Sequence, residues 1–315
     1  MRVSLFLTIA IIALLAGVSG CASIKAEKNA PPIGRFVNVD GEQMHILEAG
    51  VEHKGKAPSI ILIHGASVNL RDMKIALGDP LSKRYHVLMI DRPGRGYSTR
   101  PDDGYRLARQ AELIRGASKV LDIDKPIVVG QSFGGSVALA YGLEYQEDMS
   151  GLVVLAAVSH EWPGGIAWYN TVSNTPIIGK FLRWFVVPLY GQSVGPNGIE
   201  ESFAPNPAPD NYYDAVGLPL LFRPKDFKSN AEDISNLKRE VMAMAGRYGE
   251  LKLPVAIVTG DMDTTVSPEL HSKTLVNEID GASLDVLENT GHPLHHARKD
   301  QIIGIIDEIV ASTDL

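Results

Sequence analysis

The sequence predicts an α/β fold in which a mostly parallel sheet is covered by helices on both faces. Short apolar runs alternate with longer segments of helical periodicity along most of the chain. The runs are continuously apolar, as in strands that are buried on both faces. Regular succession of strand and helix indicates parallel strands joined by helical crossovers.

The predicted sheet has eight strands and begins with a hairpin. Phe36–Val39 and Gln43–Glu48 alternate apolar and polar residues around Asp40-Gly41, a strong hairpin signal. These two strands add an antiparallel edge to the sheet. The other six are the buried runs Ser59–Ile63, Val87–Ile90, Ile127–Val129, Leu152–Val158, Val255–Thr259 and Leu284–Leu287.

Four helical segments lie between or after these strands and are expected to cover the sheet. They are Tyr105–Leu121, Gly134–Tyr145, Pro268–Ile279 and Arg298–Ala311.

Residues 160–249 break the alternation of strand and helix. This stretch is rich in Pro and Gly and contains all three Trp residues. We expect a helical cap inserted into a core formed by residues 34–159 and 250–315. The most apolar part of the cap is Ile177–Tyr190, which predicts either a helix packed over the core and ended by Pro188, or an interfacial helix that rests on lipid.

Composition excludes several classes of protein. The chain has 315 residues, enough to bury a large core without disulfides, and is 45% hydrophobic and 21% charged, as ordinary globular proteins are. The net charge is −7 and no basic block stands out, so no nucleic-acid partner is expected. The single cysteine excludes a disulfide framework and a cysteine-based metal site.

The N-terminus predicts an export signal. Residues 1–20 combine an early arginine, an apolar stretch and small residues, as secretory signal peptides do. Val18-Ser19-Gly20-Cys21 resembles the lipobox of bacterial lipoproteins, which implies cleavage before Cys21 and attachment of diacylglycerol to its thiol. In these lipoproteins an Ala such as Ala22 implies the outer membrane.

We therefore expect a cell-envelope protein, anchored by lipid on the periplasmic face of the outer membrane, with residues 21–33 as a tether. An uncleaved membrane anchor and a plain secreted protein are the alternatives.

Gly130-Gln131-Ser132-Phe133-Gly134 follows a predicted strand and opens a predicted helix. This is the G-x-S-x-G nucleophile elbow in its required context of strand, sharp turn and helix. Ser132 is therefore the candidate nucleophile.

A serine hydroxyl needs a base, and the base needs an orienting acid. Acid and histidine follow the serine in that order in such folds. Asp263 comes directly after one strand and His292 after the next, at the strand ends where parallel sheets place their sites. Asp261 is the alternative acid. His295 and His296 are expected at a solvated helix start, and no metal site is predicted because no carboxylate spacing matches them.

An oxyanion hole requires two donors that are fixed before the reaction. The backbone amide of Phe133, directly after the nucleophile, is one candidate. The amide of Ala66, in the loop after the first buried strand, is the other. His64 in the same loop is expected to be structural.

Five motifs in order resemble the α/β-hydrolase superfamily over nearly the whole mature chain. They are His64-Gly65-Ala66, Asp91–Ser98, Gly130–Gly135, Gly260–Asp263 and Gly291-His292. The resemblance implies that the Asp91–Ser98 loop is structural, with a site entrance as the alternative place for Arg92 and Arg95.

A serine at the nucleophile position disfavours haloalkane dehalogenases and epoxide hydrolases, which carry Asp there. Esterases, lipases, lactonases, C–C hydrolases, perhydrolases and some peptidases remain.

The sequence thus predicts a cofactor-free serine hydrolase that acts on a small-molecule ester or acyl substrate, most simply a carboxylic ester. Two alternatives stay open: acyl transfer to an acceptor other than water, and a non-catalytic, membrane-tethered lipoprotein that binds a ligand on the same scaffold.

Overall fold

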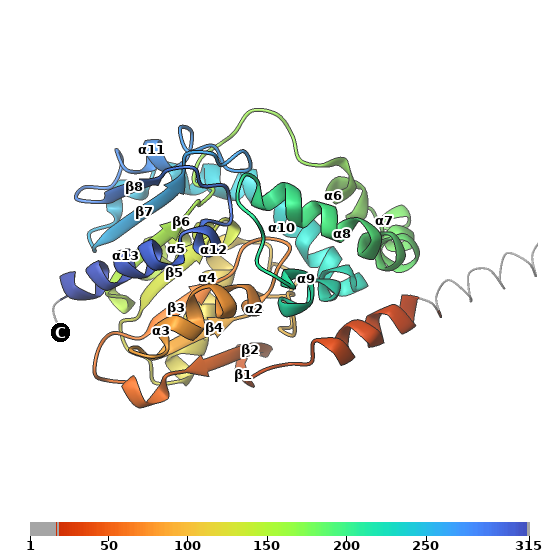
Figure 1. Ribbon diagram of the computed structural model, residues 1–315, viewed down its shortest axis with the longest axis horizontal. Coiled ribbons are helices and arrows are strands. Elements are labelled where there is room, and N and C mark those ends of the chain that lie inside the picture. Colours follow the sequence, from red (N-terminus) through yellow and green to blue (C-terminus); the bar gives the residue numbers. More distant parts are fainter. Residues whose placement is uncertain (1–16, 18, 314–315) are drawn as a thin grey trace, which may run out of the picture.

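The centre of the molecule is an eight-stranded, mostly parallel sheet (Figure 1). The computed structural model describes residues 17 and 19–313. The strands are β1 Arg35–Val39, β2 Glu42–Ala49, β3 Ile60–Ile63, β4 Val87–Ile90, β5 Ile127–Gln131, β6 Gly151–Leu155, β7 Val255–Gly260 and β8 Ser283–Leu287. Their order across the sheet is β1-β2-β4-β3-β5-β6-β7-β8. Only the β1–β2 and β2–β4 pairs are antiparallel, so the predicted architecture is confirmed.

Helices cover both faces of this sheet. One face packs against α4 Leu107–Val120 and α5 Phe133–Tyr145, and the other against α2 Leu70–Met73, α3 Asp79–Leu81 and α13 Lys299–Ser312. Strand β3 shows why its sequence is continuously apolar. Ile61 and Ile63 belong to one core, whereas Ile60 and Leu62 belong to the core on the opposite face.

A group of helices that is inserted between β6 and β7 in the sequence lies over one end of the sheet (Figure 1). They are α6 Trp168–Ser173, α7 Ile178–Phe181, α8 Val187–Phe203, α9 Tyr212–Ala215 and α10 Pro224–Ala245. We call this group the cap. It has a small core of its own, which includes Phe203, Tyr212 and Phe222.

Three local expectations were wrong. Pro188 does not end a cap helix, because the chain is helical on both sides of it, from α7 through a π-type turn at Leu182–Val186 into α8. Residues 70–81 are helical although no helix was predicted there. Only Ser272–Leu275 of the expected helix Pro268–Ile279 is α-helical (α11), because the amides of Asn277 and Glu278 bond carbonyls only three residues back.

Most of the predicted signal peptide, residues 1–16 and 18, lies outside the described residues. The segment that follows, expected to be a tether, is helical over residues 19–29. Ala26 and Ala30 of this segment pack against Leu220 of the cap. Within the part of the chain that the structure describes, no helix has both the length and the hydrophobicity that crossing a bilayer requires.

Candidate active site

Ser132 occupies a sharp turn between β5 and α5. Its backbone has φ 54° and ψ −119°, a conformation that a non-glycine residue adopts only where the surroundings enforce it. Helix and strand approach closely on both sides of the turn. A Cβ at Gly130 would collide with the Gly134 carbonyl, and one at Gly134 with the Ile63 carbonyl. The glycines therefore permit the turn, and the turn presents the Ser132 side chain at the C-terminal edge of the sheet.

The structure brings Ser132, His292 and Asp263 together from three separate loops. The Ser132 Oγ lies 2.9 Å from His292 Nε2, and His292 Nδ1 lies 2.7 Å from Asp263 Oδ2. The Asp263 carboxylate is fully shielded from solvent, whereas the imidazole is 11% exposed. This is the order of contacts in which a carboxylate holds an imidazole and the imidazole can accept the serine proton.

Asp263 and Asp261 have different surroundings. The second oxygen of Asp263 accepts hydrogen bonds from the amides of Thr265 and Val266, both at 2.8 Å, so the carboxylate is held in place. Asp261 is exposed, and its carboxylate accepts a bond from the Thr290 amide at 3.1 Å. Asp261 thus supports the loop before His292 without touching its ring.

The two residues whose amides are expected to hold an oxyanion, Phe133 and Ala66, both belong to segments next to Ser132. Phe133 is the first residue of α5, and the first amides of a helix have no intrahelical acceptor. Ala66 lines the cavity beside Ser132. Its loop is close, since a Cβ at Gly65 would lie 3.4 Å from the Ser132 Cβ. The next amide, Ser67, donates to Asn230 of α10 at 2.8 Å, so the cap helps to fix this loop.

His64 is a structural residue of the same loop, as expected. Its Nδ1 lies 2.8 Å from the Gly65 carbonyl, and its Nε2 accepts the Arg92 amide at 3.0 Å. Complete burial, reinforced by the neighbouring Arg92 charge, lowers the pKa of His64 to about 3. The ring is therefore neutral and does not exchange protons at neutral pH.

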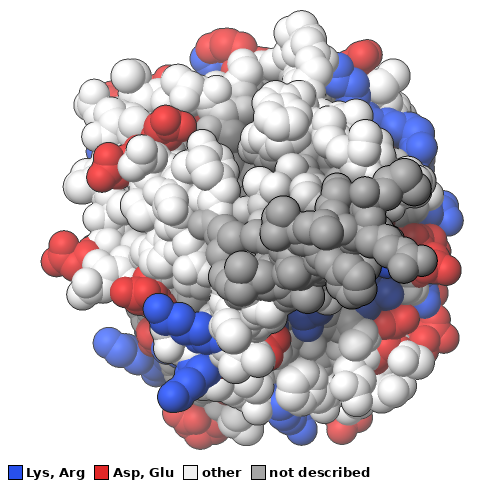
Figure 2. All heavy atoms as spheres, turned by 90° about the vertical axis from the view of Figure 1, so that its right-hand side faces the viewer, with Lys and Arg blue, Asp and Glu red and all other residues white. Residues whose placement is uncertain are grey.

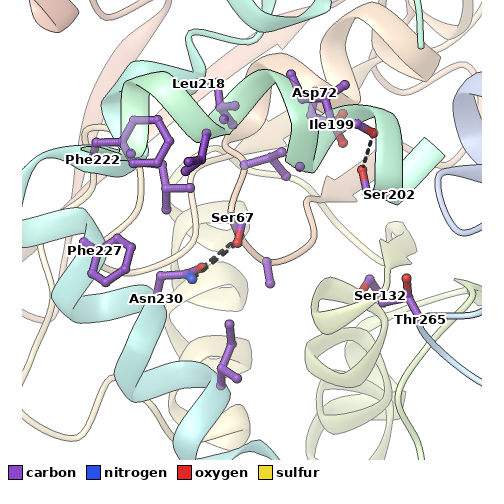
Figure 3. A pocket seen from close by; sticks show the side chains of 18 of the residues that line it. Ser67, Asp72, Ser132, Ile199, Ser202, Leu218, Phe222, Phe227, Asn230 and Thr265 are labelled. Atoms are coloured by element: carbon purple, nitrogen blue, oxygen red, sulfur yellow. Dashed lines mark hydrogen bonds between the residues drawn. The ribbon is translucent and has the colours of Figure 1, made fainter. Parts of the chain in front are cut away.

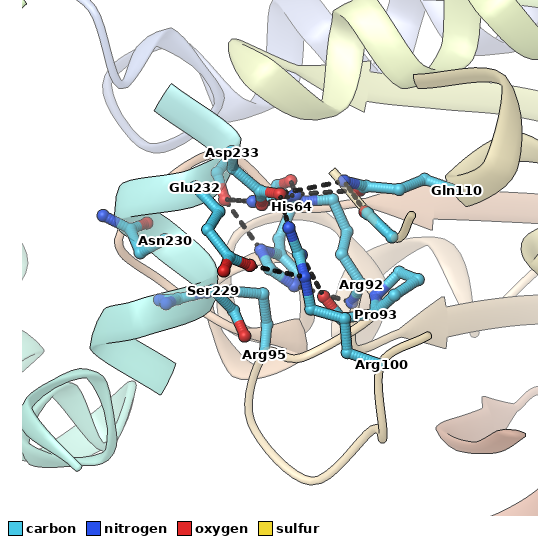
Figure 4. A network of polar contacts seen from close by, with 12 residues as sticks. His64, Arg92, Pro93, Arg95, Arg100, Gln110, Ser229, Asn230, Glu232 and Asp233 are labelled. Atoms are coloured by element: carbon cyan, nitrogen blue, oxygen red, sulfur yellow. Dashed lines mark hydrogen bonds and ion pairs between the residues drawn. The ribbon is translucent and has the colours of Figure 1, made fainter. Parts of the chain in front are cut away.

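Arg92 and Arg95 do not lie at a site entrance. Both are buried beneath the cap (Figure 4). The Arg92 guanidinium contacts the His64 carbonyl, forms a fully buried ion pair with Asp233 of α10 at 2.7 Å, and lies over the Phe133 ring at 4.2 Å. The Asp91–Ser98 loop therefore joins the core, the nucleophile turn and the cap.

His295 and His296 are buried around a carboxylate that the sequence did not associate with them. His295 Nε2 lies 2.8 Å and His296 Nε2 2.7 Å from the two oxygens of Asp72. The Tyr212 hydroxyl of the cap donates to the same carboxylate at 2.6 Å. The solvated helix start was the wrong expectation, because a residue 223 positions away in the sequence covers these rings.

Among the described residues, Asp72, His295 and His296 are the group whose ligand atoms lie close enough, within 4.8 Å, to hold a metal ion. The Asp72 carboxylate is already occupied, because two imidazoles and a phenol surround it, whereas the buried His295 Nδ1 has no hydrogen-bond partner among the described residues. Burial alone would raise the pKa of Asp72, but the two imidazoles outweigh it and hold that pKa well below its usual range. The cluster therefore acts as a hydrogen-bonded link between the core, the cap and the loop that carries His292.

A cavity of about 760 Å³ extends from Ser132 and His292 into the cap (Figure 3). Side chains of α8, α10 and the segment between them form most of its wall, and these include Ile199, Leu218, Phe222 and Phe227. The cavity is thus predominantly apolar, and Ser132 and His292 lie in its wall.

Known proteins match this chain over most of its length. Residues 58–298 match the family model described as alpha/beta hydrolase fold. The chain is 26% identical to 2-hydroxymuconate semialdehyde hydrolase of Pseudomonas putida, over 92% of this chain and 99% of that protein. It is 26% identical to proline iminopeptidase of Saccharolobus solfataricus (88% and 94%) and 25% identical to human monoacylglycerol lipase ABHD6 (82% and 77%).

Solved structures share the same fold. The esterase EaEST from Exiguobacterium antarcticum superposes with a TM-score of 0.71 at 19% identity, covering 89% of this chain and all of that one. The meta-cleavage product hydrolase of Pseudomonas fluorescens gives 0.67 at 22% identity, covering 88% and 97%.

Proposed function

Because this chain belongs to the α/β-hydrolase family, we propose that it hydrolyses carboxylic esters through an acyl-enzyme on Ser132. The observation that carries the proposal is the unbroken series of contacts from Asp263 through His292 to the Ser132 hydroxyl, 2.7 Å and 2.9 Å long, at one end of an apolar cavity.

In the proposed reaction His292 Nε2 takes the Ser132 proton while the oxygen attacks the ester carbonyl carbon. The Phe133 and Ala66 amides stabilise the negative oxygen of the tetrahedral intermediate. The imidazolium, held by Asp263, then protonates the leaving alcohol. A water molecule that gives a proton to His292 attacks the acyl-enzyme, and the acid leaves as Ser132 regains its proton.

The cavity supports an uncharged, apolar substrate. None of the described residues that line it is Lys or Arg, and its carboxylate, Asp72, is already bound by three donors. Burying an anionic or cationic substrate group there without a partner would be costly. An ester whose acyl or alcohol part is a hydrocarbon chain fits this lining better than a charged substrate does.

The test compares the wild-type protein with Ser132→Ala on a p-nitrophenyl ester of a medium-length acid. We expect turnover to fall by at least about 10³-fold, while the circular dichroism spectrum is unchanged. A folded Ser132→Ala protein with wild-type turnover would contradict the proposal.

We also propose that Cys21 carries the lipid anchor in the cell envelope. Support comes from the lipobox-like sequence Val18–Cys21 and from its being the chain's single cysteine. Growth with a clickable fatty acid should label the wild-type chain and leave Cys21→Ser unlabelled. Equal labelling of both chains would contradict lipidation at this residue.

A further inference from the structure

Exposed apolar side chains are concentrated in one part of the cap, residues 168–194. Nine of the sixteen large apolar residues that are exposed in the described part of the chain lie between residues 168 and 194. The surface formed by Trp168, Ile177, Ile178, Phe181, Trp184 and Tyr190 is called here the cap face. Ile177 is 83% and Trp168 70% exposed. Exposed apolar residues scattered singly need no explanation, but a concentration such as this marks a binding surface.

The cap face continues into the cavity above Ser132. Trp168 and Tyr190 are largely exposed and also line that cavity. The mouth of the cavity therefore opens among apolar surface residues. A hydrocarbon chain that enters between these two side chains meets a mostly apolar lining on its way to the serine.

The N-terminal helix leaves the domain at the same end. In Figure 1 residues 19–29 run toward the end of the molecule where α7 and α8 lie. This helix is fixed to the domain, because Glu27 pairs with Arg223 at 2.9 Å and the Tyr97 hydroxyl donates to the Ala30 carbonyl at 2.7 Å. Cys21 is five helical residues from Ala26, about 8 Å along the helix axis. A lipid at Cys21 would thus hold this end of the domain close to the bilayer.

We propose that the cap face docks on the lipid bilayer and opens the Ser132 cavity toward it. The occupant is a lipid surface, since the proposed lipid anchor at Cys21 lies on the helix at this end. Figure 2 looks onto this end and shows uncharged surface over much of it. Lys180 is exposed in α7, and Lys25 and Lys28 are exposed on the N-terminal helix; such cations suit anionic headgroups.

The inference deepens the proposed function and, for its catalytic consequence, rests on it. The substrate class becomes an ester with a long acyl or alcohol chain that is dissolved in the membrane. With the cap face docked, the substrate would move from the bilayer to Ser132 along one continuous apolar surface.

Docking itself is tested without catalysis, by tryptophan quenching in the full chain. Single-Trp variants keep Trp168, Trp184 or Trp162, with Phe at the other two positions, and are reconstituted in vesicles of phosphatidylethanolamine and phosphatidylglycerol with brominated acyl chains. Trp162 is the internal control, because it is half-buried and lies against His271 and Lys238.

We expect the brominated lipid to quench Trp168 and Trp184 strongly and Trp162 weakly. The Ser132→Ala protein should show the same pattern, so docking is measured independently of ester hydrolysis. Equal quenching at all three positions, or protection of Trp168 and Trp184 in a chemically cross-linked dimer, would overturn the proposal.

The catalytic consequence is tested with Ile177→Ser/Ile178→Ser, which changes two exposed residues that do not line the cavity. Hydrolysis of a vesicle-dissolved ester should fall about tenfold because docking loses apolar contact, while hydrolysis of a soluble short ester is unchanged. Val120→Ser, which alters an exposed apolar residue at the end of α4, is the matched control and should change neither rate. An equal fall for both esters would attribute the effect to the fold and contradict docking. If the brominated lipid quenches Trp168 and Trp184 as expected but the protein hydrolyses neither ester, the proposed ester hydrolysis is refuted and the proposed docking is not.

Discussion

Replacing Asp263 by Asn changes the hydrogen bond that orients the catalytic histidine while it leaves the shape and packing of the side chain at position 263 almost unchanged. The carboxylate is fully buried, and one of its oxygens is held by the amides of Thr265 and Val266. A carboxamide of the same shape keeps its oxygen on these two donors. Its NH₂ group is then turned toward His292 Nδ1, which now must accept a hydrogen bond. The imidazole is forced to carry its proton on Nε2, where it can no longer accept the proton of Ser132.

The expected cost follows from this reversed tautomer. Loss of tautomer control by the carboxylate lowers kcat by about 10⁴-fold in serine proteases, which corresponds to about 5.5 kcal/mol of transition-state stabilisation. We expect a comparable loss in Asp263→Asn, measured as release of p-nitrophenol under saturating substrate. Thermal unfolding should change little, because the variant retains its backbone contacts.

Asp261→Asn is the matched control. This side chain is exposed, and an amide oxygen can still accept the hydrogen bond from Thr290. We expect kcat within about threefold of wild type, as for a surface substitution. An equal loss in both variants, or a larger loss in Asp261→Asn, would refute the assignment of Asp263 as the orienting acid.

Three further outcomes follow from the structure. In Asp72→Ala the buried donors of His295, His296 and Tyr212 lose their acceptor, so the free energy of unfolding in urea should fall by about 3–5 kcal/mol. An unchanged free energy of unfolding would show that the cluster does not hold the cap. Ile199→Trp fills the cavity wall, so kcat/KM should fall about tenfold for a decanoyl ester relative to an acetyl ester; parallel changes would place the acyl chain elsewhere. Burial lowers the pKa of His64 to about 3 and, with the charge of His160, that of His271 to about 4, so these rings take up protons mainly when the protein unfolds. The urea concentration at the unfolding midpoint should therefore decrease as the pH is lowered from about 7 to about 5. A midpoint that does not change over this range would contradict the neutral state of the two rings.

The sheet could be predicted because its signal is local. Six strands are short apolar runs and two form a hairpin of alternating residues, and together they correspond to the eight observed strands. The nucleophile turn is local too, since glycines at fixed offsets and a preceding strand define it. The helix over residues 70–73 had a weaker signal, the Asn69 side chain that accepts the Arg71 amide as an N-terminal cap.

Contacts between distant segments could not be predicted. Asp72 meets His295 and His296 across more than 220 residues, and Arg92 meets Asp233 across 141. No periodicity or motif marks such pairs, because the fold alone brings them together. The packing of Ala26 and Ala30 on the cap was equally hidden, since the segment around them is rich in charged residues.

The most direct measurement of the central claim is the site of attack by a fluorophosphonate probe. Such a probe forms a stable bond only with a serine whose hydroxyl is activated by a neighbouring base. Peptide mass spectrometry should locate the label on Ser132, and His292→Ala should abolish labelling while the protein remains folded. Labelling of another serine, or undiminished labelling of Ser132 in the absence of the imidazole, would contradict the account.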